Sequence, residues 1–425
     1  MLSKIKKVEE IIFCLIILFL PTQLGFHFWP SFSYVYGLRI DYLSPTVYLT
    51  DVLIVLLFLT FLLRFFLSKQ KIKFIWLKKN AWFLVFIFSL IGGVLISRSP
   101  LARAYGLAKF AEFIFFGAYS ISVFKDKILF KKIIILLSIG VIFEGLLAIA
   151  QFFNSGSLGS ILYFFGERAF NGQTPGIANA SLAGQLILRP YATFPHPNVL
   201  AAFLLISLLF CFFIFTRALS IKEKIFFTTA IIIGSLSLVL TMSRVSLVVY
   251  LLLVIFLIFA KHQRKLVIFL IIIFIIIFLS PIKFRFFDLN LNDTAVIQRQ
   301  ELTVSSLLMV KDNFFLGVGI NNFLGNLPFY KNMSSGFYLQ PVHNIYLLVL
   351  AQTGIIGLIF FFWFLKKTFS FLLKKKSKIF ILKILLLMSF LTLGLFDHYF
   401  LTLQQGQMLF ALIFGFLWTD INSIS

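Results

Sequence analysis

Long apolar stretches separated by polar ones run along the whole chain. About twelve of them have the length that crosses the hydrocarbon core of a bilayer. They cover residues 8–29, 46–67, 81–97, 104–124, 131–153, 197–216, 225–242, 245–260, 266–281, 345–365, 379–397 and 404–420. Lipid offers no hydrogen-bond partners to backbone amides, so each stretch is predicted to be a helix. The pattern therefore predicts an all-α, polytopic integral membrane protein with about twelve transmembrane helices.

Composition agrees with this class of fold. The chain is 60% hydrophobic and only 12% charged, and no soluble domain could bury that much apolar surface. Both cysteines, Cys14 and Cys211, lie in apolar stretches, which excludes a disulfide framework and a cysteine metal site. Pro21 and Gln23 interrupt the first stretch and no small-residue cleavage site follows it, so we expect no cleaved signal peptide.

The net charge of +23 becomes informative once the basic residues are located. If the spans cross alternately, the termini and the connections after even-numbered spans share one side, and most lysines and arginines lie there. Short basic connections stay in the cytoplasm, so both termini are predicted to be cytoplasmic. The charge is then a topology signal and a source of affinity for anionic membrane lipids, and it predicts no nucleic-acid partner.

Polar residues gather on the opposite, outer side of the predicted membrane protein. That side carries two long loops, residues 154–196 and 282–344, and a short connection with Asp397 and His398. The sequence contains no Walker or dinucleotide-binding glycine pattern. We therefore expect the chemistry to face away from nucleotide substrates and to use no cofactor.

Three arginines on the outer side have the chemistry of a phosphate site. Arg189 precedes a span, Arg244 lies between two spans, and Arg299 opens a helix that is predicted to end near Asp312. Arginine presents a planar fork of donors that matches phosphate oxygens, and it keeps its charge. The alternative is that each arginine snorkels to lipid phosphate, as many arginines at helix ends do.

His343 is the main candidate for acid–base chemistry, because it lies at a predicted boundary between water and membrane. The side chain of histidine titrates closest to neutral pH. Together with Asn344 it could instead cap the following helix, and the residue types alone leave the two roles even. His196 could be a structural cap or a site residue, and His398 could be paired with Asp397 at a helix end.

Four short motifs, in this order, resemble the pattern of the O-antigen ligase and polymerase family. They are Arg189-Pro190-Tyr191-Ala192-Thr193-Phe194-Pro195-His196-Pro197-Asn198, Ser243-Arg244, the Arg299 helix with Gly317-Val318-Gly319 after it, and His343-Asn344 followed by Gln352-Thr353-Gly354. The sequence departs from the family pattern at Phe314, where a proline is usual, and at Gln352, where glutamate is frequent. These departures bear on the subfamily, because neither touches the candidate phosphate or base groups.

The resemblance implies a glycosyltransferase of the cell envelope. Such enzymes take a glycan from a polyprenyl diphosphate carrier, such as undecaprenyl diphosphate, and pass it to an acceptor hydroxyl in polysaccharide biosynthesis. Arg189, Arg244 and Arg299 would bind the diphosphate and stabilise it as it leaves. His343 would accept the proton of the acceptor hydroxyl. The secondary site candidates are His196, Asn198, Asn344, His398 and Gln405.

A single displacement would invert the anomeric centre, because carboxylates that could serve a retaining mechanism are sparse on the outer side. The sequence shows no metal-ligand spacing, so we predict that the reaction needs no metal. Ligase, polymerase and protein O-oligosaccharyltransferase share these motifs, and the acceptor, whether glycan, lipid or protein, stays open.

Two other classes of function compete with the enzyme. A flippase for lipid-linked oligosaccharides should carry charges deep within its spans, and these are nearly charge-free here apart from Glu144. A non-catalytic assembly subunit would need no base at position 343.

These expectations divide the chain into two regions. Residues 1–153 form an N-terminal transmembrane region with spans one to five. Residues 154–425 form an O-antigen ligase-like catalytic region with spans six to twelve and both long outer loops. The partners are a polyprenyl-diphosphate-linked glycan donor, an acceptor and membrane lipids, in a multi-pass protein of the cell membrane whose active face lies outside.

The predicted orientation can be tested with single cysteines at Lys375 and Ser335, in a background that lacks Cys14 and Cys211. An impermeant thiol reagent added to intact cells should label position 335 and leave position 375 unlabelled until the cells are opened. Labelling of position 375 from outside would contradict the whole topology.

Overall fold

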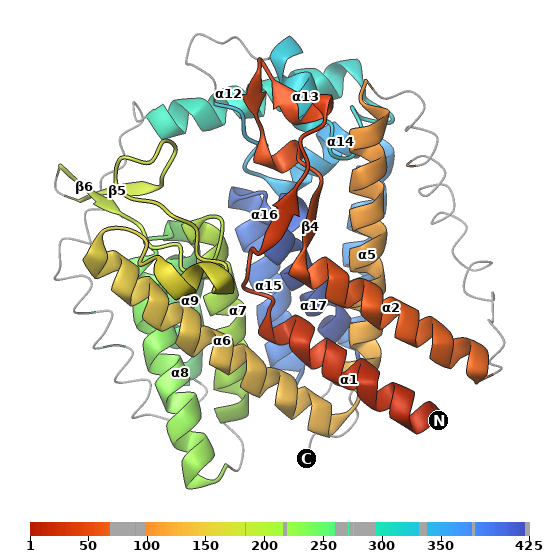
Figure 1. Cartoon of the computed structure of the whole chain (residues 1–425), viewed down its shortest axis with the longest axis vertical. Helices are drawn as coiled ribbons and strands as arrows, with labels where there is room; N and C mark the ends of the chain where they lie inside the picture. The colour runs from red at the N-terminus through yellow and green to blue at the C-terminus, as the bar shows by residue number, and fades with distance from the viewer. Residues whose placement is uncertain are drawn as a thin grey trace.

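The structure is a computed structural model that describes residues 1–68, 98–182, 184–215, 219–259, 294–330, 338–375 and 379–420, with single residues at 90, 271 and 275. Apart from those single residues, the predicted spans at 81–97 and 266–281 lie outside the described part. The described chain is mostly helical, with three small two-stranded sheets (Figure 1).

Six described helices are long and apolar enough to cross a membrane. They are α2 (Leu49–Leu67), α5 (Pro100–Phe124), α6 (Lys127–Asn154), α7 (Pro197–Phe215), α8 (Ile221–Leu240) and α14 (Ile345–Lys374). Each coincides with a predicted span. Four shorter helices occupy other predicted spans, namely α1 (Leu2–Leu18), α9 (Arg244–Phe259), α15 (Phe380–Phe396) and α17 (Gln404–Leu417). A multi-pass membrane fold is therefore supported, but the count of twelve spans is not confirmed.

The first predicted span, residues 8–29, is wrong at its end. Helix α1 stops at Leu18, and the chain then forms a short strand, β1 (Gly25–His27), which pairs with β4 (Thr46–Tyr48). A proline at position 21 cannot continue a helix beyond its first turn, which explains the early end. The segment 19–48 instead folds over one end of the helix bundle (Figure 1).

Helix α7 forms the centre of the bundle. Its side chains are apolar on every face, and nearly all of them are buried. A helix of this composition is expected inside a protein or a membrane and not at a polar surface. It packs against α6, α8, α9 and α15, and its first turn carries residues of the candidate site.

The helix that Arg299 was predicted to open is α12 (Thr294–Asp312), which lies across one end of the bundle (Figure 1). Its predicted end at Asp312 is confirmed, but the helix begins earlier, at Thr294, so the predicted start is wrong. The short helix α13 (Phe323–Asn326) follows it. An apolar cluster joins the N-terminal segment to α12 and α14 and includes Val35, Leu302, Met309 and Leu348. The loop 154–196 contains a hairpin, β5 (Asn179–Leu182) and β6 (Gln185–Leu188), that the sequence pattern did not predict.

Helix α14 is interrupted at Gly354, where φ is +64°. The turn after α12 lies against this interruption and forms hydrogen bonds with the backbone groups of α14 that the interruption leaves free. Val318 N donates to Ala351 O at 2.9 Å, and Ile355 N donates to Phe314 O at 2.8 Å. Backbone groups freed inside a membrane helix need such partners, because lipid supplies none. The turn and the first two turns of α14 therefore form one rigid unit.

Two glycines make this contact possible. A Cβ atom at Gly317 would meet the carbonyl group of Gln352, and a Cβ atom at Gly354 would meet the carbonyl group of Phe315. Both glycines also have φ of +64°, a conformation that L residues rarely adopt. Two of the four family-like motifs, Gly-Val-Gly and Gln-Thr-Gly, are thus the two sides of one packing contact.

The expectation of nearly charge-free spans is wrong for the N-terminal helices. Lys109 in α5 pairs with Asp51 at 2.6 Å and with Glu112 at 3.2 Å, and Arg64 in α2 pairs with Glu9 at 2.7 Å. Charged groups inside membrane helices are tolerated when they pair within the bundle. A low content of buried charge therefore no longer argues against a transport role.

We expect Gly354→Ala to lower the free energy of unfolding by on the order of 2 kcal/mol or more, because the left-handed backbone and the Phe315 carbonyl both oppose a Cβ atom. Thermal unfolding of the detergent-solubilised protein measures the effect. Gly325→Ala is the matched control, since a Cβ atom there meets nothing within 4 Å. Equal melting temperatures for the two variants would contradict the proposed contact.

Candidate functional site

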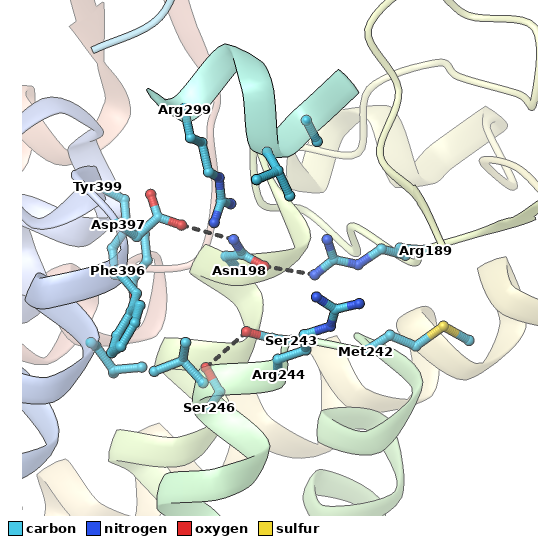
Figure 2. Close-up of a pocket in the computed structure, with 14 residues that line it drawn as sticks. Arg189, Asn198, Met242, Ser243, Arg244, Ser246, Arg299, Phe396, Asp397 and Tyr399 are labelled. Atoms are coloured by element: carbon cyan, nitrogen blue, oxygen red, sulfur yellow. Dashed lines mark hydrogen bonds between the residues drawn. The ribbon is translucent and has the colours of Figure 1, made fainter. Parts of the chain in front are cut away.

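The three arginines singled out in the sequence line one cavity, which we call the arginine cavity (Figure 2). Arg189 lies on the segment that leads into α7, Arg244 is the first residue of α9, and Arg299 lies on α12. The sequence placed these residues only on a common side of the membrane. The fold brings three separate segments together around a single space that also touches Asn198 and Asp397.

Arg189 is held rigidly at the wall of this cavity. Its Nε donates to Thr241 O at 2.6 Å, and its Nη2 donates to Asn198 Oδ1 at 2.6 Å. The residue is only 6% exposed. A snorkelling arginine would extend into the headgroup region instead, so this geometry argues for a binding role.

Asn198 continues the hydrogen-bond chain to Asp397. Its Nδ2 donates to Asp397 Oδ2 at 2.7 Å, and the backbone N of His398 donates to Asp397 Oδ1 at 2.8 Å. The Nδ1 atom of His398 lies 2.7 Å from Thr402 Oγ1. One connected chain therefore runs from Arg189 to Thr402 and fixes both the carboxylate and the imidazole.

His343 stands directly against His398. The two rings are 4.9 Å apart between centroids and are nearly perpendicular, and the ring of Tyr338 stacks over His343 at 6.5 Å. The Nδ1 atom of His343 is buried and has no hydrogen-bond partner among the described residues. A buried nitrogen without a partner is rare in folded proteins and is a common property of functional groups.

The capping role considered for His343 belongs to Asn344 alone. Asn344 is the N-cap of α14, and its Oδ1 accepts a hydrogen bond from Leu347 N at 2.9 Å. Its Nδ2 also donates to Leu395 O at 3.2 Å, which ties the start of α14 to the end of α15. His343 therefore contributes no cap hydrogen bond.

Burial and charge keep both histidines neutral. Burial, with the nearby His398 and Arg299, lowers the pKa of His343 to about 3, although Asp397 acts in the opposite sense. Burial likewise lowers the pKa of His398 to about 4. Burial would raise the pKa of Asp397, but the three neighbouring histidines and the hydrogen bond from Asn198 hold it below its usual range. At neutral pH the cluster thus holds two neutral imidazoles and one carboxylate.

Two secondary candidates have structural contacts. The Nδ1 atom of His196 accepts a hydrogen bond from Asn198 N at 3.1 Å, so its ring supports the first turn of α7. Burial, with Arg189 nearby, lowers the pKa of His196 to about 3. Gln405 donates to Thr22 O at 2.9 Å and does not line the arginine cavity.

Two polar side chains of α6 position the loop that carries Arg189. Glu144 accepts hydrogen bonds from Thr193 N at 3.0 Å and from Thr193 Oγ1 at 2.8 Å. Gln151 Oε1 accepts from Ala192 N at 2.7 Å. The buried carboxylate that stood out in the sequence as a possible transport group is therefore an anchor for this loop.

The cluster also has the residue types of a metal site. Ligand atoms of His343, Asp397 and His398 lie within 4.8 Å of one another. The arginines of the adjacent cavity repel a cation. We therefore retain the prediction that the reaction needs no metal.

Sequence reasoning missed three members of this site. Asp397 was considered only as a partner for His398, although the pair Asp-His at a span end was a visible signal. Thr402 and Tyr42 contact His398, the latter with ring centroids 5.5 Å apart. Tyr42 had no sequence signal, because it belongs to a segment predicted only as the connection between two spans.

Comparison with known families agrees with the motifs. No curated protein sequence matches the chain. Residues 229–362 match the family described as O-antigen ligase, and this range includes Arg244, Arg299 and His343. This range is similar to the O-antigen ligase family and covers three of the four motifs, whereas the motif that contains Arg189 lies outside it.

Proposed function

We propose that this protein is a membrane glycosyltransferase that moves a glycan from a polyprenyl diphosphate to an acceptor hydroxyl at the outer face of the cytoplasmic membrane. The observation that carries the proposal is the meeting of Arg189, Arg244 and Arg299 in one cavity that borders the Asp397, His398 and His343 cluster. The family match supports an O-antigen ligase-like or polymerase-like activity.

The arginine cavity suits the diphosphate of the donor. When the glycosidic bond breaks, negative charge grows on the oxygen that joined the sugar to the diphosphate. Arginine forks that are already held in place stabilise this charge without reorganising during the reaction. Arg189 meets this requirement, because its hydrogen bonds to Thr241 and Asn198 hold its guanidinium in position.

His343 is the proposed general base. The acceptor oxygen forms a bond to the anomeric carbon, its proton moves to His343, and the carbon–oxygen bond to the diphosphate breaks, which inverts the anomeric centre. The nearby Asp397 carboxylate stabilises the imidazolium as it forms, as an aspartate does beside the histidine of a catalytic triad. His398 acts as a positioning residue that packs against the base.

Donor binding should strengthen this base. In the free protein, burial, His398 and Arg299 lower the pKa of His343. A diphosphate in the arginine cavity brings negative charge close to the ring and offsets the charge of Arg299, and nearby negative charge raises the pKa of a histidine. The histidine then accepts a proton more readily when a donor is present.

A flippase would also use arginines to hold a lipid diphosphate, but it would not need a neutral histidine beside a fixed carboxylate. A non-catalytic subunit would need neither. A transfer assay on His343 variants therefore separates the enzyme from these two alternatives.

His343→Ala should reduce transfer on the order of a hundredfold or more, because a general base contributes about that much. His343→Asn should lose as much, since Asn344 already supplies the helix cap. Both variants should keep the wild-type melting temperature and bind the lipid-linked donor. Near-normal transfer by His343→Asn would remove this residue from the mechanism and direct attention to His398.

The pH dependence of transfer should differ between the free and the donor-bound enzyme. The acidic limb of kcat/KM for the donor reports the free enzyme and should lie near pH 3, where His343 titrates. The acidic limb of kcat reports the bound enzyme and should lie at higher pH, because the diphosphate raises the pKa of the base. Coincident limbs would contradict the coupling between donor and base.

Arg189→Lys keeps the charge but loses the fork that contacts Thr241 and Asn198. We expect at least a tenfold loss of transfer, which corresponds to about 1.4 kcal/mol, at an unchanged protein level. Transfer by the wild-type protein should persist in EDTA if arginines alone stabilise the diphosphate. Full activity with lysine would assign Arg189 to lipid contact instead.

A further inference from the structure

A second cavity lies beside the cluster, on the side of the N-terminal segment. Its walls come from that segment, from α5, from the residues before α13, and from α16 (Tyr399–Thr402) and α17. The lining residues that matter here are Tyr42, Tyr105, Lys109, Gln352, Thr402 and Gln404. Most of these belong to parts of the chain that the proposed chemistry does not use.

The pair Asp397 and His398 stands between the two cavities. Asp397 lines the arginine cavity, whereas Thr402, which lies 2.7 Å from His398 Nδ1 through its Oγ1, lines the second cavity. Tyr42 also lines the second cavity and meets the ring of His398 edge to face. The two spaces therefore approach the histidine cluster from different sides.

The lining of the second cavity suits an uncharged ligand with many hydroxyl groups. Tyrosine rings offer flat apolar faces, and the glutamines offer both donors and acceptors of hydrogen bonds. Among the described lining residues the one cation is Lys109, which is already paired with Asp51 and Glu112, and Asp41 adds a further carboxylate to the lining. A second anionic diphosphate would be repelled from this space.

Gln404 is a buried polar side chain of this cavity, and one of its atoms is unsatisfied. It is 3% exposed, its Nε2 donates to Thr50 Oγ1 at 3.0 Å and to Asp51, and it lines the second cavity. Its Oε1 has no hydrogen-bond partner among the described residues. A buried amide oxygen without a partner is costly unless a ligand or water satisfies it.

We infer that the second cavity is the acceptor subsite and that it holds the sugar end of an uncharged, hydroxyl-rich glycan. This inference rests on the proposed function. In a single displacement the acceptor attacks from the side opposite to the leaving group, so acceptor and diphosphate must lie on opposite sides of the anomeric carbon. A sugar hydroxyl at the edge of the second cavity faces the histidines, and the diphosphate occupies the arginine cavity.

The test uses Gln352→Leu in the full chain, reconstituted in nanodiscs. Gln352 lines the second cavity, and no side-chain hydrogen bond holds it in the described structure, so this nearly isosteric change should not disturb folding. Gln173→Leu is the matched control, because Gln173 is exposed in the loop 154–196 and lines neither cavity.

A synthetic polyprenyl diphosphate with a short glycan serves as donor, and methyl hexosides, methyl N-acetylhexosaminides and a serine-containing peptide serve as acceptors. We expect Gln352→Leu to raise KM for a glycoside acceptor at least tenfold. It should leave KM for the donor and the hydrolysis of the donor by water unchanged, and Gln173→Leu should change none of these. An unchanged acceptor KM in Gln352→Leu overturns the inference while the transferase remains.

Binding without a donor separates the inference from the proposed function. Saturation-transfer NMR should detect the methyl glycosides on the wild-type protein, with a signal at least fivefold weaker on Gln352→Leu. If the wild type binds glycosides in this way but transfers no glycan, the proposed function fails and the sugar site stands. Glycosides that do not bind at all, or a peptide that is the better acceptor, overturn the sugar assignment.

Discussion

The candidate site depends on one amide. Asn198 accepts a hydrogen bond from Arg189 and donates one to Asp397, so it joins the group proposed to bind phosphate to the group that supports the base. An amide side chain can accept through its oxygen and donate through its nitrogen at the same time. A carboxylate at this position would oppose Asp397, and an apolar side chain would remove one hydrogen bond from each of two buried charged groups, which is costly. Because Asn198 lies in the first turn of α7, whose residues are nearly all buried, its place is set by the packing of the bundle.

A second constraint fixes the position of His343, the proposed base. His343 immediately precedes α14, and the first turns of that helix are locked by the turn after α12 through the interruption at Gly354. The cap of Asn344 and its bond to Leu395 O then tie the same helix to α15, which ends beside Asp397. His343 and Asp397 thus lie next to the ends of two different helices, and both are attached to rigid backbone. Catalytic groups need such support, because small displacements of the reacting atoms cost large factors in rate.

Hydropathy predicted the positions of most helices of the described core, because a continuous apolar stretch in this chain has few alternatives to a helix. It did not predict that α14 continues beyond its span to Lys374. It failed for the segment after Leu18, since an apolar segment that packs on protein resembles one that faces lipid. The shared side of the three arginines and the position of His343 followed from motif order and topology. Their convergence on one cavity did not, because it depends on helix packing between distant segments. The role of Gln404 was equally hidden, since a polar residue at a predicted span end has many ordinary explanations.

Two electrostatic requirements of the proposed site oppose each other, namely stabilising a diphosphate and protonating a histidine. This opposition explains the position of Asp397. Arginines that stabilise a leaving diphosphate also make it harder to protonate a nearby histidine, and Arg299 lowers the pKa of His343 and of His398. A metal ion in the same place would impose the same conflict with a larger local charge. One carboxylate placed between the cavities reduces this effect at the base. Since both of its oxygens are held by donors, Asp397 keeps its charge and its orientation while the proton moves. The proposed mechanism is therefore served by a fold that places the arginines, Asp397 and His343 on separate segments.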